Sequence, residues 1–288
     1  MTLKLIKVFG ERNTASRAVI RMIDAAPFLL EAGHPGVDED DLAKYDVMID
    51  QVSSIYAGPW KRVYREAIKD IRAQAMGPLG AWKHAAPDYD RTYKALNVSV
   101  LFLARNPYSW IQSLNRRPYH CMGRRQQNLE EFLVFPWLCL GRDNIDPILS
   151  SPMYLWSLKL AAYQRFRDRA AVDGVSSAVM RFEDFVQNPV LALNRALLSM
   201  DVESGGLRSF PEATKPEPHL TSGRKMYYLN EEWRNDLTST AVSLINDMVD
   251  WSIADQFGYT KLDPADFPDI DDLEVSSSDR KGRPASAA

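Results

Sequence analysis

Cationic, hydroxyl and imidazole side chains follow several short apolar segments of the chain. The first such segment, residues 3–9, is followed by Gly10-Glu11-Arg12-Asn13-Thr14-Ala15-Ser16-Arg17, after which a helical pattern begins. A strand, a loop of small and hydroxyl residues and a helix start together form an anion site, because unpaired amides and the positive end of the helix dipole point at the ligand. The loop therefore predicts a phosphate site. Taken alone, it is also compatible with an ordinary Ser or Thr helix cap.

The same loop departs from the Walker pattern GxxxxGK[ST]. Ala15 and Ser16 stand where that pattern requires its second Gly and its Lys. This departure disfavours a nucleoside triphosphatase.

Arg105 directly follows the apolar residues 98–104, so it is expected at the carboxyl end of a strand. Asn106 is suited to cap the next helix, and Pro107 to its first position. The Arg105 guanidinium offers paired donors that match a phosphate, and Ser113, or less favourably Ser109, can complete such a site from the helix. A surface salt bridge is the alternative role for an isolated Arg.

Lys83 and His84 end a third apolar segment, residues 80–84. The unperturbed pKa of His, about 6.5, lets it act as a base near neutral pH, and Lys can neutralise charge on a departing phosphate oxygen. Both roles suit group transfer, whereas a Lys-His pair alone also fits a solvated turn.

Two later segments offer further contacts to a nucleotide. Phe182 follows residues 177–181 and can stack on a base, while Glu183 and Asp184 can anchor nearby loops by accepting hydrogen bonds. The alternative is a core Phe with acids that favour a helix start. Arg224 and Lys225, beside a Gly, suit a lid over a phosphate or a solvated basic turn.

Apolar periodicity predicts strands that alternate with helices along the chain. Strands are expected at residues 3–9, 80–84, 98–104 and 177–181, and helices at 16–30, 59–75, 107–115, 128–140, 152–173, 189–200 and 238–257. This alternation predicts an α/β fold with a central parallel sheet covered by helices on both faces, and ligands of such sheets bind at the carboxyl ends of the strands.

Composition restricts the class of protein. The 288 residues, 45% hydrophobic and 25% charged, suffice for one domain over residues 1–263, and residues 264–288 are predicted to be a disordered acidic, Ser-rich tail. The net charge of −3 argues against general nucleic-acid binding. We expect no transmembrane segment, no export signal and no metal or disulfide at Cys121 and Cys139, which together favour the cytoplasm.

Taken together, these segments resemble the sulfotransferase family that uses 3'-phosphoadenosine 5'-phosphosulfate (PAPS). Residues 10–17 are similar to its bacterial GERNSGTN phosphate loop, and Arg105-Asn106-Pro107 with Ser113 eight residues after Arg105 resembles its 3'-phosphate segment. Trp82-Lys83-His84-Ala85-Ala86-Pro87 is similar to its strand with a catalytic His. Arg181-Phe182-Glu183-Asp184 resembles its (Y/F)ED segment near the adenine, and Arg224-Lys225 its Arg-Lys-Gly lid, with Met226 in place of the Gly.

The resemblance implies a P-loop-like three-layer fold and a sulfotransferase that carries a sulfuryl group from PAPS, its co-substrate, to a hydroxyl or amine without a metal. It implies His84 as the base, with Lys83 and Arg12 as catalytic cations, since the loop lacks the Lys of the cytosolic branch. The implied cofactor-binding residues are Arg12, Asn13, Thr14, Ala15, Ser16, Arg17, Arg105, Ser113, Phe182, Arg224 and Lys225.

The acceptor and the oligomeric state stay open. The acceptor is expected to be a small molecule, a carbohydrate or a lipid headgroup, and its pocket can include an apolar and basic group of residues that also fits a core and a solvated turn. That group comprises Trp110, Arg116, Arg117, Tyr119, His120 and residues 132–137. A kinase with the same loop is one alternative, and a silent module that binds adenosine 3',5'-bisphosphate is another, kept open by Ala15 in place of the usual Gly.

Overall fold

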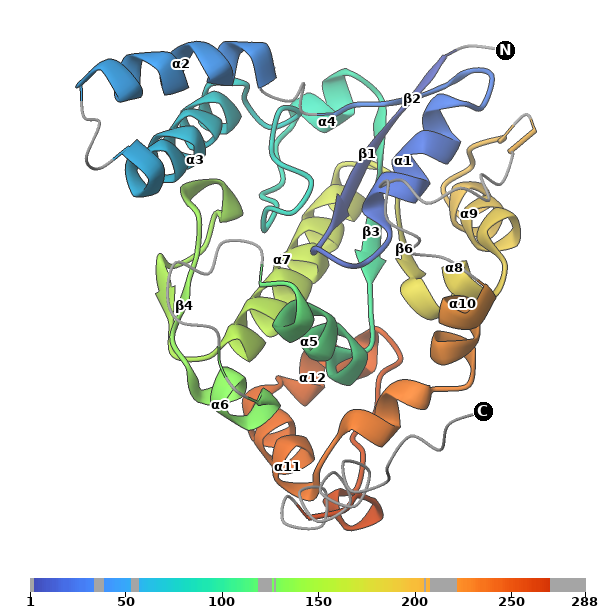
Figure 1. The fold of residues 1–288 in the computed structure, drawn as a ribbon. Coiled ribbons are helices and arrows are strands. Elements are labelled where there is room, and N and C mark those ends of the chain that lie inside the picture. The colour runs from blue at the N-terminus through green and yellow to red at the C-terminus, as the bar shows by residue number, and fades with distance from the viewer. Residues whose placement is uncertain are drawn as a thin grey trace, which may run out of the picture.

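A parallel four-stranded sheet forms the centre of the protein. The computed structural model describes residues 3–33, 39–52, 57–118, 126, 128–204, 206–207 and 222–269. Within them the strand order is β2-β1-β3-β6, and every neighbouring pair is parallel (Figure 1). The strands are β1 (Lys4–Gly10), β2 (Leu29–Glu31), β3 (Val98–Ala104) and β6 (Ser177–Arg181). A separate antiparallel pair joins β4 (Trp137–Leu138) to β5 (Ile148–Leu149).

Helices connect and cover these strands. The α-helices are α1 (Ser16–Asp24), α2 (Glu39–Val52), α3 (Ala57–Ala75), α4 (Thr92–Ala95), α5 (Pro107–Arg116), α6 (Leu129–Val134), α7 (Pro152–Val172), α8 (Phe182–Gln187), α9 (Pro189–Leu198), α10 (Ser222–Leu229), α11 (Ser239–Met248) and α12 (Trp251–Gln256). The 3-10 helices are η1 (Gly141–Asp143), η2 (Glu232–Asp236) and η3 (Pro264–Asp266). None of the described helices combines the length and apolar character that a membrane span requires.

Each face of the sheet has its own hydrophobic core. On one face, strand residues such as Leu101 and Leu103 pack with α1 and α9. On the other face, Val100 and Phe102 pack with α5 and α7. Alternate residues of β3 thus enter opposite cores, which explains why every residue of the strand is buried and why all of them except Ser99 are apolar. The prediction of an α/β fold with a central parallel sheet between two helical layers is confirmed.

The predicted strand at residues 80–84 is wrong. Residues 76–80 form a turn after α3, and residues 81–85 are bends and turns with no strand partner. The segment nevertheless runs beside the end of β1, because Lys7 donates from Nζ to the carbonyl oxygens of Leu79 (2.7 Å) and Ala81 (2.9 Å). Side-chain contacts take the place of a strand ladder here. The strand that pairs with the other edge of β1 is the short β2, which was not predicted from the sequence.

Several predicted helices are correct in kind but end elsewhere. The helix predicted over 16–30 ends at Asp24, because Pro27 follows and β2 begins two residues later. The helix predicted over 128–140 ends at Val134, before Pro136. The helix predicted over 238–257 is two helices, since Val249 is extended and Asp250 caps α12 through the amides of Ser252 and Ile253. Helices α2, α4, α8 and α10 were not predicted.

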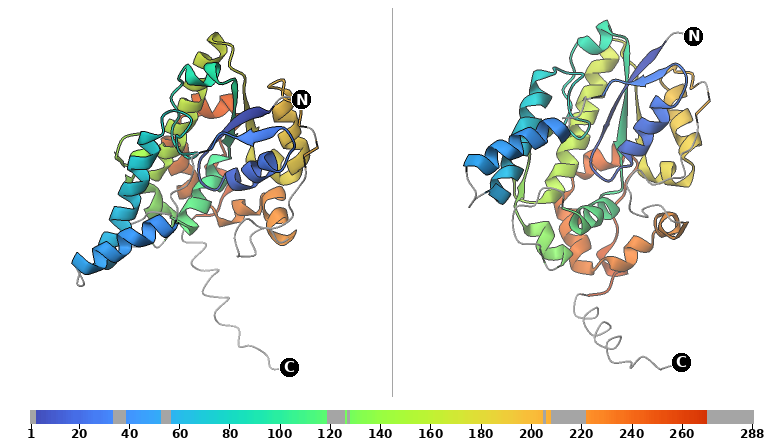
Figure 2. Two further views of the ribbon diagram at one scale, coloured as in Figure 1. Left: turned by 90° about the horizontal axis from the view of Figure 1, so that it is seen from above. Right: turned by 45° about the horizontal axis from the view of Figure 1, so that its top comes forward.

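The hairpin of α2 and α3 lies at the outside of the molecule (Figure 2). It is anchored at η1, where the Asp70 carboxylate of α3 accepts from the amide of Gly141 (2.9 Å) and from Nη1 of Arg142 (2.6 Å). Residues 264–269, which the sequence analysis assigned to the tail, contain η3, and the amide of Ser239 donates to the carbonyl of Pro268 (2.9 Å). The rest of the predicted tail lies outside the described residues.

Candidate active site

The loop between β1 and α1 contains two left-handed residues that are not Gly. Asn13 has φ 68° and Ala15 has φ 67°, and Ala15 is the N-cap of α1 without a side-chain capping bond. A left-handed residue between right-handed ones turns successive amides toward one point, which is a known anion-binding arrangement. At the start of this loop, a Cβ on Gly10 would lie 2.7 Å from Cβ of Leu103 on β3, so the close approach of the strands requires Gly.

Side chains from β3 and α5 bind the carbonyl groups of this loop. Trp110 donates from Nε1 to the carbonyl oxygen of Arg12 (3.1 Å), and Arg105 donates from Nη1 to that of Asn13 (2.7 Å). Within the described part of the chain, the amides of Asn13, Ala15, Ser16 and Arg17 have no hydrogen-bond acceptor. With its carbonyls bound and these amides available, the loop can accept an anion.

His84 contacts the end of β1 from the turn segment. Its Nδ1 lies within hydrogen-bond distance of the Gly10 carbonyl oxygen, and the Gly10 amide donates to the carbonyl of Lys83 (2.8 Å). A carbonyl only accepts, so Nδ1 carries the proton and Nε2 of the neutral ring has a free lone pair. Burial, then the charge of Arg12, lowers the pKa of His84 well below its ordinary value. The imidazole is therefore neutral and basic at Nε2 near neutral pH.

Cations surround this imidazole. The Arg12 guanidinium lies 5.0 Å from the centre of the Trp82 ring, and that ring meets His84 edge-on at 4.9 Å. Burial lowers the pKa of Lys83, and the charges of Arg17 and Arg12 add to this effect against the opposing charge of Glu31. Neither Lys83 nor Arg17 forms an ion pair with any residue that the structure describes. The predicted catalytic and loop cations thus lie together.

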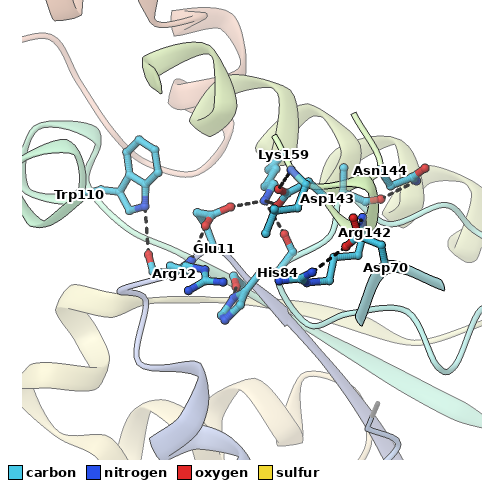
Figure 3. A network of polar contacts seen from close by, with 12 residues as sticks. Glu11, Arg12, Asp70, His84, Trp110, Arg142, Asp143, Asn144 and Lys159 are labelled. Carbon is cyan, nitrogen blue, oxygen red and sulfur yellow. Dashed lines mark hydrogen bonds and ion pairs between the residues drawn. The ribbon is translucent and has the colours of Figure 1, made fainter. Parts of the chain in front are cut away.

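Behind the loop lies a buried ion network that the sequence analysis missed. Lys159 of α7 is fully buried and donates from Nζ to the Glu11 carboxylate, to the carbonyl of His84 and to the Asp143 carboxylate (2.7 Å) (Figure 3). Burial alone would lower the pKa of Lys159, but the two carboxylates raise it above its ordinary value. One signal was available: Leu155, Lys159 and Tyr163 are four residues apart, so Lys159 stands on the apolar face of its helix.

Arg105 forms a second cationic centre at the end of β3. The side chain is 2% exposed and donates to Ser109 Oγ (3.0 Å), to Ser113 Oγ (2.9 Å) and to the Asn13 carbonyl. It forms no ion pair with a described carboxylate. A buried guanidinium with only neutral partners is a costly arrangement that an anionic ligand can offset. The predicted helix start also holds, because Asn106 Oδ1 accepts from the amides of Tyr108 and Ser109.

Aromatic rings cover Arg105. Phe182 and Tyr228 lie 4.2 and 4.7 Å from the guanidinium carbon by their ring centres. Phe182 is buried, and its ring, which was predicted to stack on a base, faces the Arg105 guanidinium. Tyr228 belongs to α10, whose Lys225 donates to the carbonyl of Gln187 (3.1 Å). The side chain of Arg224 lies outside the described residues. The expectation that Glu183 anchors a nearby loop is confirmed, because it accepts from the Asn106 amide (2.9 Å).

The residues considered for an acceptor pocket divide into two groups. Trp110, Phe132 and Trp137 are buried in the core, which agrees with the alternative that these residues are core and do not line a pocket. Arg116 is exposed and donates to the Tyr227 hydroxyl (3.0 Å). Arg117 is exposed as well, and Tyr119 and His120 lie outside the described residues. Among the described residues, no group of three His, Cys, Asp or Glu side chains can hold a metal ion.

A scan against protein-family models and a search of curated proteins found no match. Among solved structures, the chain is similar to a sulfotransferase domain from the curacin biosynthetic pathway, with 12% identity and a TM-score of 0.40 over 91% of this chain and 99% of that one. It is also similar to a sulfotransferase from Alicyclobacillus acidocaldarius, with 15% identity and a TM-score of 0.37 over 82% of this chain and 98% of that one. Both likenesses are distant.

The described fold and site define a parallel α/β protein with cations at the carboxyl ends of two adjacent strands. One group, Arg12, Lys83 and His84, lies at the carboxyl end of β1, and Arg105 follows β3. This is the edge at which parallel α/β sheets bind ligands.

Proposed function

We propose that the protein is a sulfotransferase that moves a sulfuryl group from PAPS to a hydroxyl or amine of a small-molecule, carbohydrate or lipid-headgroup acceptor. The observation that carries the proposal is the bond from Arg105 to the Asn13 carbonyl (2.7 Å), which joins two cationic centres through one loop. PAPS has anionic groups at its 5' and 3' positions. The protein has two neighbouring cationic centres, and a basic imidazole lies at one of them. Such a pair suits a nucleotide with anionic groups at both positions better than a nucleotide with a single phosphate chain.

In the proposed reaction, the acceptor oxygen or nitrogen forms a bond to sulfur while the bond from sulfur to the bridging oxygen breaks. His84 takes the acceptor's proton at Nε2, and adenosine 3',5'-bisphosphate leaves. Loop amides, Arg12 and Lys83 stabilise the charge that develops on the 5'-phosphate, while Arg105 and Ser113 bind the 3'-phosphate. A positioned base contributes on the order of 100- to 10,000-fold, or roughly 3 to 5 kcal/mol of the barrier.

A kinase is supported less well by the same residues. Phosphotransferases with a loop of this type hold Mg²⁺ between a loop hydroxyl and an acid. Here Arg105, not an acid, follows β3, the Thr14 hydroxyl donates to the carbonyl of Glu11, and the Glu11 carboxylate is bound by Lys159. A silent binding module is also supported less well, because Ala15 adopts the left-handed conformation that the loop needs, and His84 has a free basic nitrogen.

The reducing cytoplasm is the proposed location. Cys139 has no disulfide partner among the described residues, and burial raises the pKa of its thiol to about 12, so it is not reactive.

Thermal unfolding with and without nucleotides tests the proposed co-substrate. A ligand at 100 times its Kd adds about 2.7 kcal/mol to the free energy of unfolding. Adenosine 3',5'-bisphosphate should therefore raise Tm clearly, and ADP, which lacks the 3'-phosphate, should raise it much less. Equal stabilisation by ADP and ATP that increases with Mg²⁺ would favour the phosphotransferase. A screen of acceptors with a labelled sulfuryl donor then tests the transfer itself.

A further inference from the structure

His84 lies in a segment that has no secondary structure of its own. Residues 82–88 form no ladder with the sheet, apart from the single bond between the Gly10 amide and the Lys83 carbonyl. A base needs a fixed ring to accept a proton efficiently. The position of His84 must therefore come from contacts made by other elements.

The turn at η1 supplies part of this support. The Ala86 amide donates to the carbonyl of Asp143 (2.8 Å), and Asn144 donates from Nδ2 to the carbonyl of Ala86 (2.9 Å). The Arg142 guanidinium lies 4.5 Å from the centre of the Trp82 ring. These contacts fix the residues on either side of His84.

Lys159 joins this turn to the phosphate loop and to His84 itself. Its ammonium carries three hydrogens and binds three acceptors, one on each of three segments: Glu11 of the loop, the His84 carbonyl and Asp143 of η1. Figure 3 shows Lys159 between Glu11 and Asp143, with His84 beside Arg12. Glu11 in turn follows Gly10, whose carbonyl accepts the His84 ring proton. The Lys159 ammonium group therefore holds both sides of the hydrogen bond that sets the His84 tautomer: it binds the backbone of His84 itself and the side chain of Glu11, the neighbour of Gly10.

We infer that Lys159 is a positioning residue that holds the His84 imidazole in the Nδ1-protonated tautomer, with Nε2 free to accept a proton. The inference rests on the proposed function for its catalytic meaning, but the tautomer is a property of the protein alone. A lysine suits this role because one short polar head reaches three acceptors from the apolar face of α7. An amide side chain has only two donor hydrogens and cannot replace it.

The test removes the network without leaving a buried charge. Lys159→Met alone would leave two buried carboxylates without a cation, which is strongly destabilising. The variant to use is therefore Lys159→Met with Glu11→Gln and Asp143→Asn, which removes all three charges and keeps the sizes similar. Gln112→Met is the control for general destabilisation, because Gln112 is also buried and donates to a backbone carbonyl, that of Trp233 (2.9 Å), but contacts neither Glu11 nor the segment that carries His84.

The first measurement is the nitrogen spectrum of the His ring in the full-length protein, assigned with His84→Gln. We expect a single Nδ1-protonated tautomer in the wild type and in Gln112→Met, and a mixture of tautomers in the triple variant. The second is kinetic: kcat with labelled PAPS and an acceptor found by screening should fall about 10- to 100-fold, the range for a misplaced catalytic group, while KM for PAPS changes only a few fold.

A triple variant that keeps both the tautomer and kcat of the wild type would overturn the inference. An equal loss of both in Gln112→Met would overturn it too, since the effect would then be general destabilisation. If the wild type neither binds adenosine 3',5'-bisphosphate nor transfers a sulfuryl group, the proposed function fails, and the ring spectrum still decides whether Lys159 fixes the tautomer.

Discussion

The Nδ1 atom of His84 is hydrogen-bonded to the carbonyl oxygen of Gly10, so the last residue of β1 holds the side chain of the proposed base. This bond leaves Nε2 as the basic nitrogen. It also places the base next to the loop that is proposed to bind the 5'-phosphosulfate.

Replacement of His84 should remove catalysis and spare binding. We expect His84→Ala to lose at least about 100-fold in kcat and to keep the Kd for adenosine 3',5'-bisphosphate within a few fold, because a base acts only in the transition state. His84→Gln is the matched variant, since its amide can donate to Gly10 while lacking the basic nitrogen. Wild-type turnover in either variant would exclude His84 as the base.

The pH dependence of kcat/KM should reflect the lowered pKa of His84. Burial and the charge of Arg12 lower that pKa well below 6.5. The base is thus deprotonated through the neutral range, and we expect kcat/KM to decrease only at distinctly acidic pH. Arg12→Gln removes one lowering charge and should move the acid limb to higher pH. An acid limb near pH 6.5 in the wild type would contradict this environment for His84.

The same pKa makes the free energy of unfolding depend on pH. The unfolded chain protonates this His near pH 6.5, whereas the folded chain resists protonation. As pH falls below about 6.5, the unfolded state binds more protons, so this contribution to stability is lost on acidification. Denaturant unfolding at several pH values should show a smaller loss in His84→Gln than in the wild type. The same slope in both proteins would assign the loss to other groups.

Replacement of Arg105 and replacement of Ser113 should have different effects on the affinities for a ligand with a 3'-phosphate and for one without it. Ser113→Ala keeps the hydrogen bond from Arg105 to the loop. It should therefore weaken the binding of adenosine 3',5'-bisphosphate by about 0.5 to 1.5 kcal/mol and leave the binding of adenosine 5'-phosphosulfate nearly unchanged. Arg105→Ala also removes the hydrogen bond to the Asn13 carbonyl, so the binding of both ligands should weaken, and that of the bisphosphate should weaken more. Calorimetric titration measures both. Equal weakening of both ligands by Ser113→Ala would argue against a 3'-phosphate site here.

Ala15→Gly should stabilise the protein. A left-handed conformation costs an L-residue roughly 1 to 2 kcal/mol, and Gly adopts it freely at a smaller cost in unfolded-state entropy. We expect a net gain of up to about 1 kcal/mol in unfolding experiments, with no loss of bisphosphate binding. Ala18→Gly, inside α1, is the control and should lose about 1 kcal/mol. A loss of stability in Ala15→Gly would show that the loop is not strained at this residue.

The parts of the fold that depend on local pattern could be predicted from the sequence. Strand β3 is apolar apart from Ser99, β1 alternates Lys4 and Lys7 with apolar residues, and α5 begins at an Asn cap followed by Pro, so their places follow from neighbouring residues. Strand β2 could not be found, because its three residues pair with β1 and carry little pattern themselves. Residues 80–84 were predicted as a strand from a short apolar stretch, but they include Gly80, Ala81 and Lys83, which strands disfavour, and distant side chains decide their conformation.

The candidate site shows the same division. The loop, Arg105 and His84 were identified because each follows an apolar segment. Asp143 lies in a polar turn and gave no signal, since its contact with Lys159 depends on how α7 packs. The partners of Arg105 were predicted in part, because Ser109 and Ser113 follow it at helical spacing, whereas the Asn13 carbonyl lies 92 residues away.

The bond between Glu11 and Lys159 also affects how the protein is made. At roughly 5 to 20 residues per second, a ribosome needs about 7 to 30 s to synthesise the 148 residues that separate the two partners. Strand β1 must also wait for β3, its main neighbour in the sheet, which is encoded some 90 residues later. During this interval β1 has only the three-residue strand β2 as a partner, so nascent chains should depend on chaperones. Added chaperones should therefore improve the yield of folded protein.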